Sequence, residues 1–210
     1  MLIGLIVVVV LLIVGSLLFL FSDRIRQISE KKNFSKKAGK RIYALARDND
    51  FYLINQVALS IDTKVIHFDH ILFTDKFIYC IGKKYFSGPI SGKYDDSQWF
   101  QYDEKNHVEH IKNPMILPRV RLDYLRSALK ANEDLFVSVV LLNDSCVLDE
   151  IGNCPKNNYI LNLKDFKNFI QKREKADIPS INAFQLETLV QNIYKRSVKT
   201  NRIIKNEATK

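Results

Sequence analysis

The chain has 210 residues, of which 47% are hydrophobic and 26% are charged, and its formal net charge is +9. This composition is ordinary for a globular domain and excludes a chain that is disordered throughout. The surplus of positive charge lies at the two ends, because residues 50–194 contain seventeen Lys and Arg against nineteen Asp and Glu. The net charge therefore does not by itself indicate a nucleic-acid-binding protein.

Residues 1–21 are predicted to be a transmembrane anchor. Every residue from Leu2 to Phe21 is apolar or small, and about 20 such residues form a helix about 30 Å long, enough to cross a bilayer. The run follows Met1 directly and no small-residue cleavage site follows it, which favours an uncleaved anchor over a signal peptide. Basic residues from Arg24 to Arg41 predict a single-pass protein whose N-terminus is outside and whose C-terminal domain is cytoplasmic.

A basic juxtamembrane connector is predicted at 22–34, and a single domain at 35–195. Ser35 is a candidate N-cap for a helix that ends near Asn49. Three strands in a meander are expected at 51–59, 65–73 and 77–82. The sequence SGPISG at 87–92 predicts a turn, and 93–114 predicts an exposed excursion with one or two short strands.

The second half of the predicted domain alternates strands and helices. A helix opens at Pro118 and buries Leu122, Leu125, Ala128 and Leu129. Residues 135–142 form a strand buried on both faces. Shorter strands are expected at 147–148 and 159–161, helices at 163–171 and 182–195, and a basic flexible tail at 196–210. This order predicts an α/β domain with a mixed central sheet flanked by helices.

The most informative segment is Phe68–Gly92, FDHILFTDKFIYCIGKKYFSGPISG. It resembles the nuclease-related domain (NERD) family, a branch of the PD-(D/E)XK nucleases. The resemblance covers about 37–142 and implies a restriction-endonuclease-like fold. Its matching positions are Asp69-His70, the stretch from Ile81 to Gly88, Gly92, Trp99 and Asn113-Pro114.

In that family the reaction uses Mg²⁺, a hard ion that prefers carboxylate oxygens. Side chains alternate along a strand, so the family's Glu-x-Lys motif places its acid and its amine on one face. The resemblance assigns Asp69 to the first metal carboxylate and Lys84 to the motif lysine, but Gly82 occupies the position of the glutamate. Lys40 stands where the family has a second glutamate, and Leu117 where it has a glutamine.

A single acid among amines attracts anions better than Mg²⁺. The leading hypothesis is therefore a catalytically degenerate NERD protein without a cofactor, a pseudoenzyme that binds DNA, RNA or an acidic protein partner at the inner membrane face. Its candidate binding residues are Lys40, Lys83, Lys84 and Trp99, with Asp69 and Lys84 as residual catalytic positions and Asp69 as the residual metal position.

Two other functions remain open. In the first, the protein is an active Mg²⁺-dependent nuclease, and Asp95, Asp96 or Asp123 supplies the missing acid. In the second, the protein is a structural component of the membrane surface, and its basic connector and tail bind anionic lipid in the bilayer. The structural alternatives for the site residues are a hairpin or cap role for Asp69, solvated lysines in a strand, and packing for Trp99.

Overall fold

The computed structural model describes residues 2–103, 107–149, 151–152, 154–200 and 203–204, with side chains except those of 2–21, 23, 199–200 and 203–204. Its contacts divide the chain into two units, 1–37 and 38–210. Helix α1 spans Leu2–Asp48, so the predicted helix start at Ser35 is wrong and the connector at 22–34 is helical. This segment contains no Gly or Pro to stop a helix, and Arg26 pairs with Glu30 one turn later at 3.0 Å.

Within the described residues, no helix is both long enough and apolar enough to span a membrane. The anchor predicted at 1–21 falls on residues whose side chains lie outside the described set.

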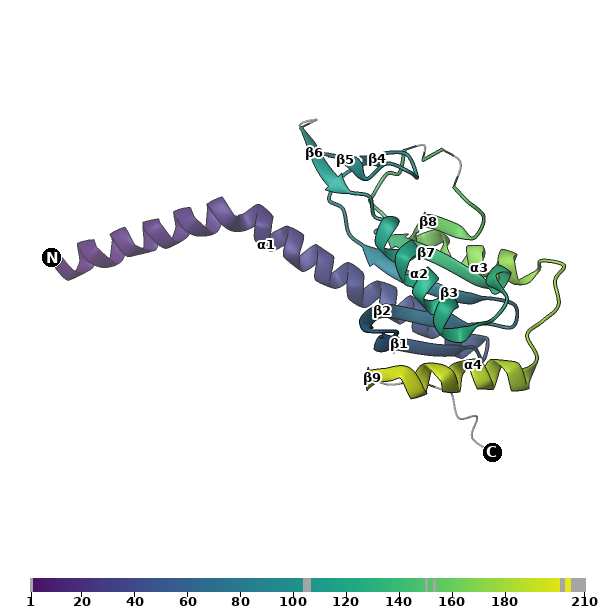
Figure 1. Cartoon of the computed structure of the whole chain (residues 1–210). Coiled ribbons are helices and arrows are strands. Elements are labelled where there is room, and N and C mark those ends of the chain that lie inside the picture. Colours follow the sequence, from purple (N-terminus) through teal and green to yellow (C-terminus); the bar gives the residue numbers. More distant parts are fainter. Residues whose placement is uncertain (1, 104–106, 150, 153, 201–202, 205–210) are drawn as a thin grey trace. The chain divides into compact units, whose positions relative to one another are not determined.

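A mixed sheet forms the centre of the second unit, in the strand order β10-β1-β2-β3-β7-β8, and β9 also pairs with β1 (Figure 1). The strands are β1 (Tyr52–Ile61), β2 (Lys64–Phe73), β3 (Ile78–Lys84), β7 (Phe136–Leu142), β8 (Asn158–Asn162), β9 (Ser197–Thr200) and β10 (Ile203–Ile204). The first three form the predicted antiparallel meander. β7 lies parallel to β3, and β8 lies parallel to β7. The predicted α/β fold with a mixed central sheet is thus confirmed.

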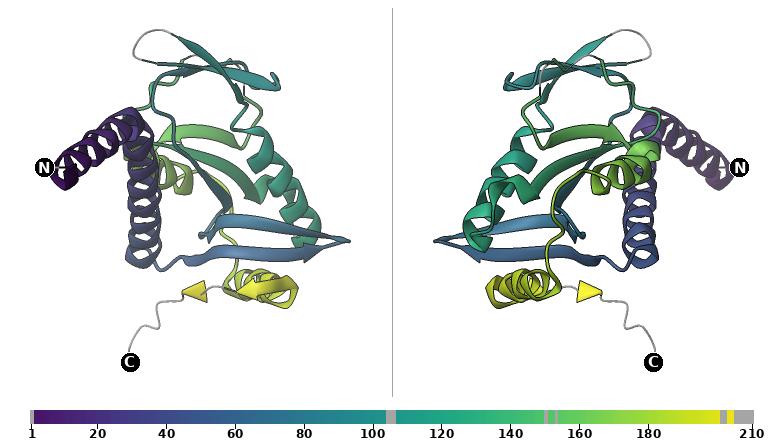
Figure 2. Two further views of the ribbon diagram at one scale, coloured as in Figure 1. Left: turned by 90° about the vertical axis from the view of Figure 1, so that its left-hand side faces the viewer. Right: turned by 90° about the vertical axis from the view of Figure 1, so that its right-hand side faces the viewer.

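Helices cover both faces of this sheet (Figure 2). Helices α2 (Ile116–Leu129) and α4 (Ala183–Arg196) pack with β1–β3 in one apolar cluster. Helix α3 (Phe166–Glu174) lies on the other face, where Phe169 contacts the ring of Tyr79. Every residue of β7 is buried, as expected for a parallel strand covered on both sides. Short 3-10 turns, Glu133–Leu135 and Leu163–Asp165, precede β7 and α3.

A second, three-stranded antiparallel sheet consists of β4 (Ile90–Ser91), β5 (Gln98–Tyr102) and β6 (Val108–Lys112). It replaces the turn predicted at 87–92 with a short strand. Trp99 anchors this sheet: it is fully buried, and its indole Nε1 donates to the carbonyl oxygen of Lys93 at 2.8 Å. Gly92 must lack a side chain, because a Cβ there would lie 2.3 Å from the Trp99 ring.

Two other boundaries differ from the prediction. Helix α2 begins at Ile116, two residues before Pro118, which is compatible with proline because the first helical turn needs no internal N–H donors. The predicted flexible tail at 196–210 is wrong where it is described, since Ser197–Thr200 and Ile203–Ile204 pair with the edge of β1. Val198 is the one apolar residue of Ser197–Thr200, so the sequence gives no strong strand signal there, and the free edge of β1 recruits the segment.

Candidate functional site

The candidate site lies where β2, β3 and the first turns of α2 meet. His70 of β2 is the register partner of Ile81 of β3, which brings the Asp69-His70 pair alongside Gly82. A Cβ built on Gly82 would lie 3.4 Å from the Cγ of Pro118 in α2. Positions 82 and 84 share a face because side chains alternate along β3, and that face is turned toward α2.

Asp69 is surrounded by positive charge. Its Oδ2 lies 3.8 Å from Nη1 of Arg121, a long ion pair in which the Arg121 side chain is 18% exposed. Lys83 is half-buried, and burial lowers the pKa of its amine below the ordinary value. The carboxylate of Asp69 acts in the opposite direction and raises this pKa. Burial raises the pKa of the Cys80 thiol to about 12. Arg121 acts to lower this pKa and Asp69 acts to raise it. Asp69 is thus one acid interacting with two cations.

His70 is buried and neutral next to the site, on the face of the sheet opposite Asp69. Its Nδ1 lies 2.5 Å from Oδ1 of Asn55, an oxygen that only accepts, so Nδ1 carries the proton. Burial, with the charge of Lys83 as a second cause, lowers the pKa of His70 to about 3. The other ring nitrogen, Nε2, is buried without a hydrogen-bond partner.

The side chains around Asp69 do not fit a Mg²⁺ ion, which prefers several oxygen ligands. Across the described part of the chain, no three His, Cys, Asp or Glu side chains are placed to share a metal. Asp123 pairs with Arg126 at 3.1 Å. Oδ2 of Asp96 accepts the backbone N–H of Lys93 at 3.0 Å. Two of the three proposed replacement acids, Asp96 and Asp123, thus have other partners in these contacts.

The other predicted site residues occupy different surroundings. Lys84 is half-buried at the end of β3 and pairs with Leu142 of β7. Lys40 is exposed on α1, between the buried Ala38 and Ile42. Trp99 is fully buried, so its assignment as a base-binding residue is wrong, and the packing alternative explains it.

Arg121 is the member of the site that the sequence prediction missed. The signal was present in the helical spacing, since the predicted helix buries Leu122 and Leu125. Arg121 lies four positions before Leu125, on the same side of the helix. Its long side chain carries its charge to the edge of that buried face, beside the sheet.

The site is at the end of the sheet where parallel α/β proteins bind ligands. β3, β7 and β8 end level with one another, since Lys84 pairs with Leu142 and Leu142 pairs with Asn162. Ligands in such sheets bind outside the carboxyl ends of the strands. The loops there are fixed: the Asn143 side chain bonds both the N–H and the carbonyl of Phe86, each at 2.9 Å.

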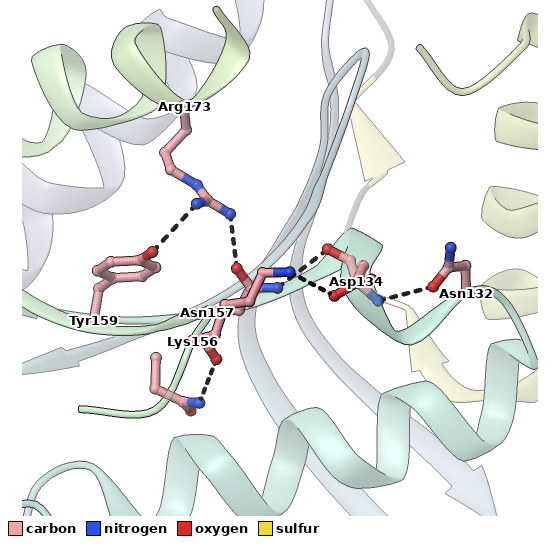
Figure 3. Close-up of polar contacts among 7 residues, drawn as sticks. Asn132, Asp134, Lys156, Asn157, Tyr159 and Arg173 are labelled. Carbon is pink, nitrogen blue, oxygen red and sulfur yellow. Dashed lines mark hydrogen bonds and ion pairs between the residues drawn. The ribbon is translucent and has the colours of Figure 1, made fainter. Parts of the chain in front are cut away.

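A larger polar cluster lies at the opposite, amino ends of β7 and β8 (Figure 3). Arg173 donates to Oδ1 of Asn157 at 2.8 Å and to the hydroxyl of Tyr159 at 3.2 Å. Asn157 in turn donates to the backbone carbonyl of Asp134, and the amine of Lys156 pairs with the Asp134 carboxylate at 3.0 Å. These contacts join α3 to the turns that precede two strands, so we interpret the cluster as a structural tie.

Comparison with known proteins identifies one family. The model of the nuclease-related domain family matches residues 31–143, more than half of the chain. Nothing among curated proteins matches the chain significantly, and no solved structure does so either.

The buried His70 makes stability depend on pH. Its folded pKa of about 3 lies below the ordinary value of 6.5, so below pH 6.5 the unfolded chain takes up a proton that the folded chain refuses. The free energy of unfolding should then fall by about 1.4 kcal/mol per pH unit toward pH 3 from this group alone. Above pH 6.5 its contribution is constant.

Urea titrations at pH 7 and pH 5 measure this dependence. We expect His70→Asn to have a lower free energy of unfolding than the wild-type chain at both pH values. From pH 7 to pH 5, however, its free energy of unfolding should fall by less than that of the wild-type chain. His67→Gln, at an exposed position of the same strand, is the control and should keep the wild-type dependence. An unchanged dependence in His70→Asn would contradict the lowered pKa, because it would show that the folded and unfolded chains protonate His70 alike.

Proposed function

The chain belongs to the nuclease-related domain family, and from this premise we propose that it is a membrane-anchored nuclease-like module that binds nucleic acid without cutting it. The site between β2, β3 and α2 would hold phosphate groups of DNA or RNA. The observation that carries the proposal is the balance of charge around Asp69, whose carboxylate pairs with Arg121 of α2 and also interacts with Lys83 on the other face of β3.

Electrostatics favour an anion at this site. A half-buried amine such as Lys83 is less screened by solvent than a surface amine, so its attraction for a phosphate is stronger. Asp69 offsets part of that charge and would repel a phosphate placed directly against it. The amines of Lys83 and Lys84 lie on opposite faces of β3, so they would contact different phosphates of one backbone.

Cleavage by the family's chemistry would require a metal that these residues do not fit. The step that a metal would supply is activation of water and neutralisation of charge on the phosphate. Gly82 offers no carboxylate, and the retained amines would hold the phosphate without those functions. The proposal is therefore of a binding module that keeps the family's fold.

Loss of the two β3 amines tests nucleic-acid binding. We expect Lys83→Gln with Lys84→Gln to weaken the affinity of the full chain for a labelled oligonucleotide about tenfold at low salt. Each lost phosphate contact means that fewer counterions are released when the nucleic acid binds. Fluorescence anisotropy measures the affinity, and repeating it over a range of salt concentrations should give a shallower salt dependence for the variant.

A charge-matched control is Lys172→Gln with Lys175→Gln, two exposed lysines at the end of α3. It should bind nearly as well as the wild-type chain. Equal losses in both double variants would mean that binding follows net charge and not this site. If the wild-type chain bound neither DNA nor RNA, the nucleic-acid proposal would be wrong, and an acidic protein would become the partner to test.

Restoring the missing acid tests the proposed lack of metal chemistry. A Cβ fits at position 82, since its nearest neighbour is the Cγ of Pro118 at an ordinary contact distance of 3.4 Å. Isothermal titration calorimetry should detect no Mg²⁺ or Mn²⁺ uptake by the wild-type chain and weak uptake by Gly82→Glu, because a second carboxylate would then face Asp69.

Plasmid cleavage assays with the same metals complete this test. Gly82→Gln is the control, since it adds the same side-chain volume without charge. Metal-dependent cleavage by the wild-type chain that Asp69→Asn abolishes would overturn the proposal, and an active nuclease with a relocated acid would replace it.

Membrane anchoring is supported by the sequence of residues 2–21 and by the basic residues that follow it. Arg is unfavourable at the centre of a membrane helix by about 2.5–3.5 kcal/mol per residue. We therefore expect Val9→Arg with Leu12→Arg to release the chain from the membrane fraction under alkaline extraction, whereas Val9→Leu with Leu12→Val should leave it there. A wild-type chain that is extracted like a peripheral protein would contradict the anchor.

A further inference from the structure

The small sheet of β4, β5 and β6 has two chemically different faces. Register and alternation place Trp99 and its cross-strand partner Ile111 on one face, where both pack into the apolar cluster that includes Val140 and Leu142. The opposite face carries Ser91, Gln98, Phe100, Tyr102, Val108, His110 and Lys112. Figure 1 shows this sheet at one end of the second unit, beyond the carboxyl ends of β3 and β7.

This outer face presents aromatic rings to solvent in a fixed arrangement. Phe100 is 37% exposed, and its ring meets that of His110 edge-on, with centroids 5.0 Å apart. Tyr102 lies two residues further along β5, about 7 Å away, and its hydroxyl is 3.2 Å from the Oγ of Ser91. Because these contacts already hold the rings, little conformational entropy remains to be lost when a planar ligand stacks on them.

The charge on the same face suits an anionic ligand. None of its seven named side chains is acidic, although residues 50–194 contain more acids than bases. Lys112 is exposed at the end of β6, where its amine can reach a phosphate beside the rings. Aromatic faces next to a cation and without carboxylates are the combination that binds single-stranded nucleic acid.

We infer that the outer face of this sheet is a stacking surface for the bases of single-stranded DNA or RNA. This inference rests on the proposed function and specifies its substrate class. Bases stack on Phe100 and Tyr102, while the backbone continues to the amines at the end of β3. Only residues 85–89 separate Lys84 from β4, so the two surfaces lie within about 20 Å, a span that a few nucleotides cover.

A single strand fits these observations better than a duplex or a membrane. The bases of a duplex are stacked on one another and cannot present their faces to Phe100. A membrane-binding surface would need a larger apolar area. Here Val108 and Phe100 are the two apolar side chains on a face that otherwise carries hydroxyls, an amide, an imidazole and an amine.

Substitution of Phe100 in the full chain tests the inference. We expect the wild-type chain to bind a labelled oligothymidylate of about 12 nucleotides more tightly than a duplex of equal length. Phe100→Leu keeps an apolar side chain but removes the π face, so it should weaken binding of the single strand about tenfold and leave duplex binding unchanged. Phe100→Tyr should restore single-strand binding, and Val108→Ala on the same face should retain it.

Trp99 is the only tryptophan, and its emission verifies that each variant keeps the small sheet folded. Wild-type affinity in Phe100→Leu, together with the loss in the Lys83 and Lys84 double variant, would overturn the stacking surface and leave the proposed function intact. If no wild-type binding of either oligonucleotide occurred, both proposals would be wrong. If Phe100→Leu instead reduced binding to vesicles of anionic lipid, without an effect on the oligonucleotide, the face would be a membrane contact.

Discussion

Asp69 lies among cations, and this one arrangement constrains the chemistry at the carboxyl ends of β3 and β7. A carboxylate 3.8 Å from Arg121 is partly neutralised before any ligand arrives, so a divalent ion gains little from it. The neighbouring position on β3 that faces α2 is Gly82, which adds no charge. Lys83 and Lys84 add positive charge at the end of β3, which favours the approach of anions there.

Next to this site, the neutral ring of His70 lies close to the charged amine of Lys83. His70 is kept uncharged beside Lys83 because burial opposes a second positive charge there. Its proton on Nδ1 is fixed by Asn55, an asparagine one strand away in β1. The meander of β1, β2 and β3 thus does more than supply a core: it sets the protonation state of a ring next to the candidate site.

Sequence patterns predicted the elements whose stability is local or whose apolar period is strong. The meander, the fully buried β7 and the buried side of α2 with Leu122 and Leu125 follow from such periods. What failed depends on distant partners: the strands after α4 form only because β1 offers a free edge. For the site, motif spacing pointed to Asp69 and Lys84, but it could not show that Arg121 pairs with Asp69 or that Trp99 turns inward, since both depend on tertiary packing.

The motif positions that this chain shares with its family are mostly positions that packing requires. The Trp99 indole bonds Lys93, and the Asn113 amide donates to the carbonyls of Tyr94 and Asp96. A Cβ on Gly88 would lie 2.0 Å from the carbonyl oxygen of Tyr102, a distance that no side chain permits. These residues determine how the small sheet joins the central one, so a family match built on them identifies a scaffold. The chemistry has to be argued separately, from the charges that the scaffold brings together.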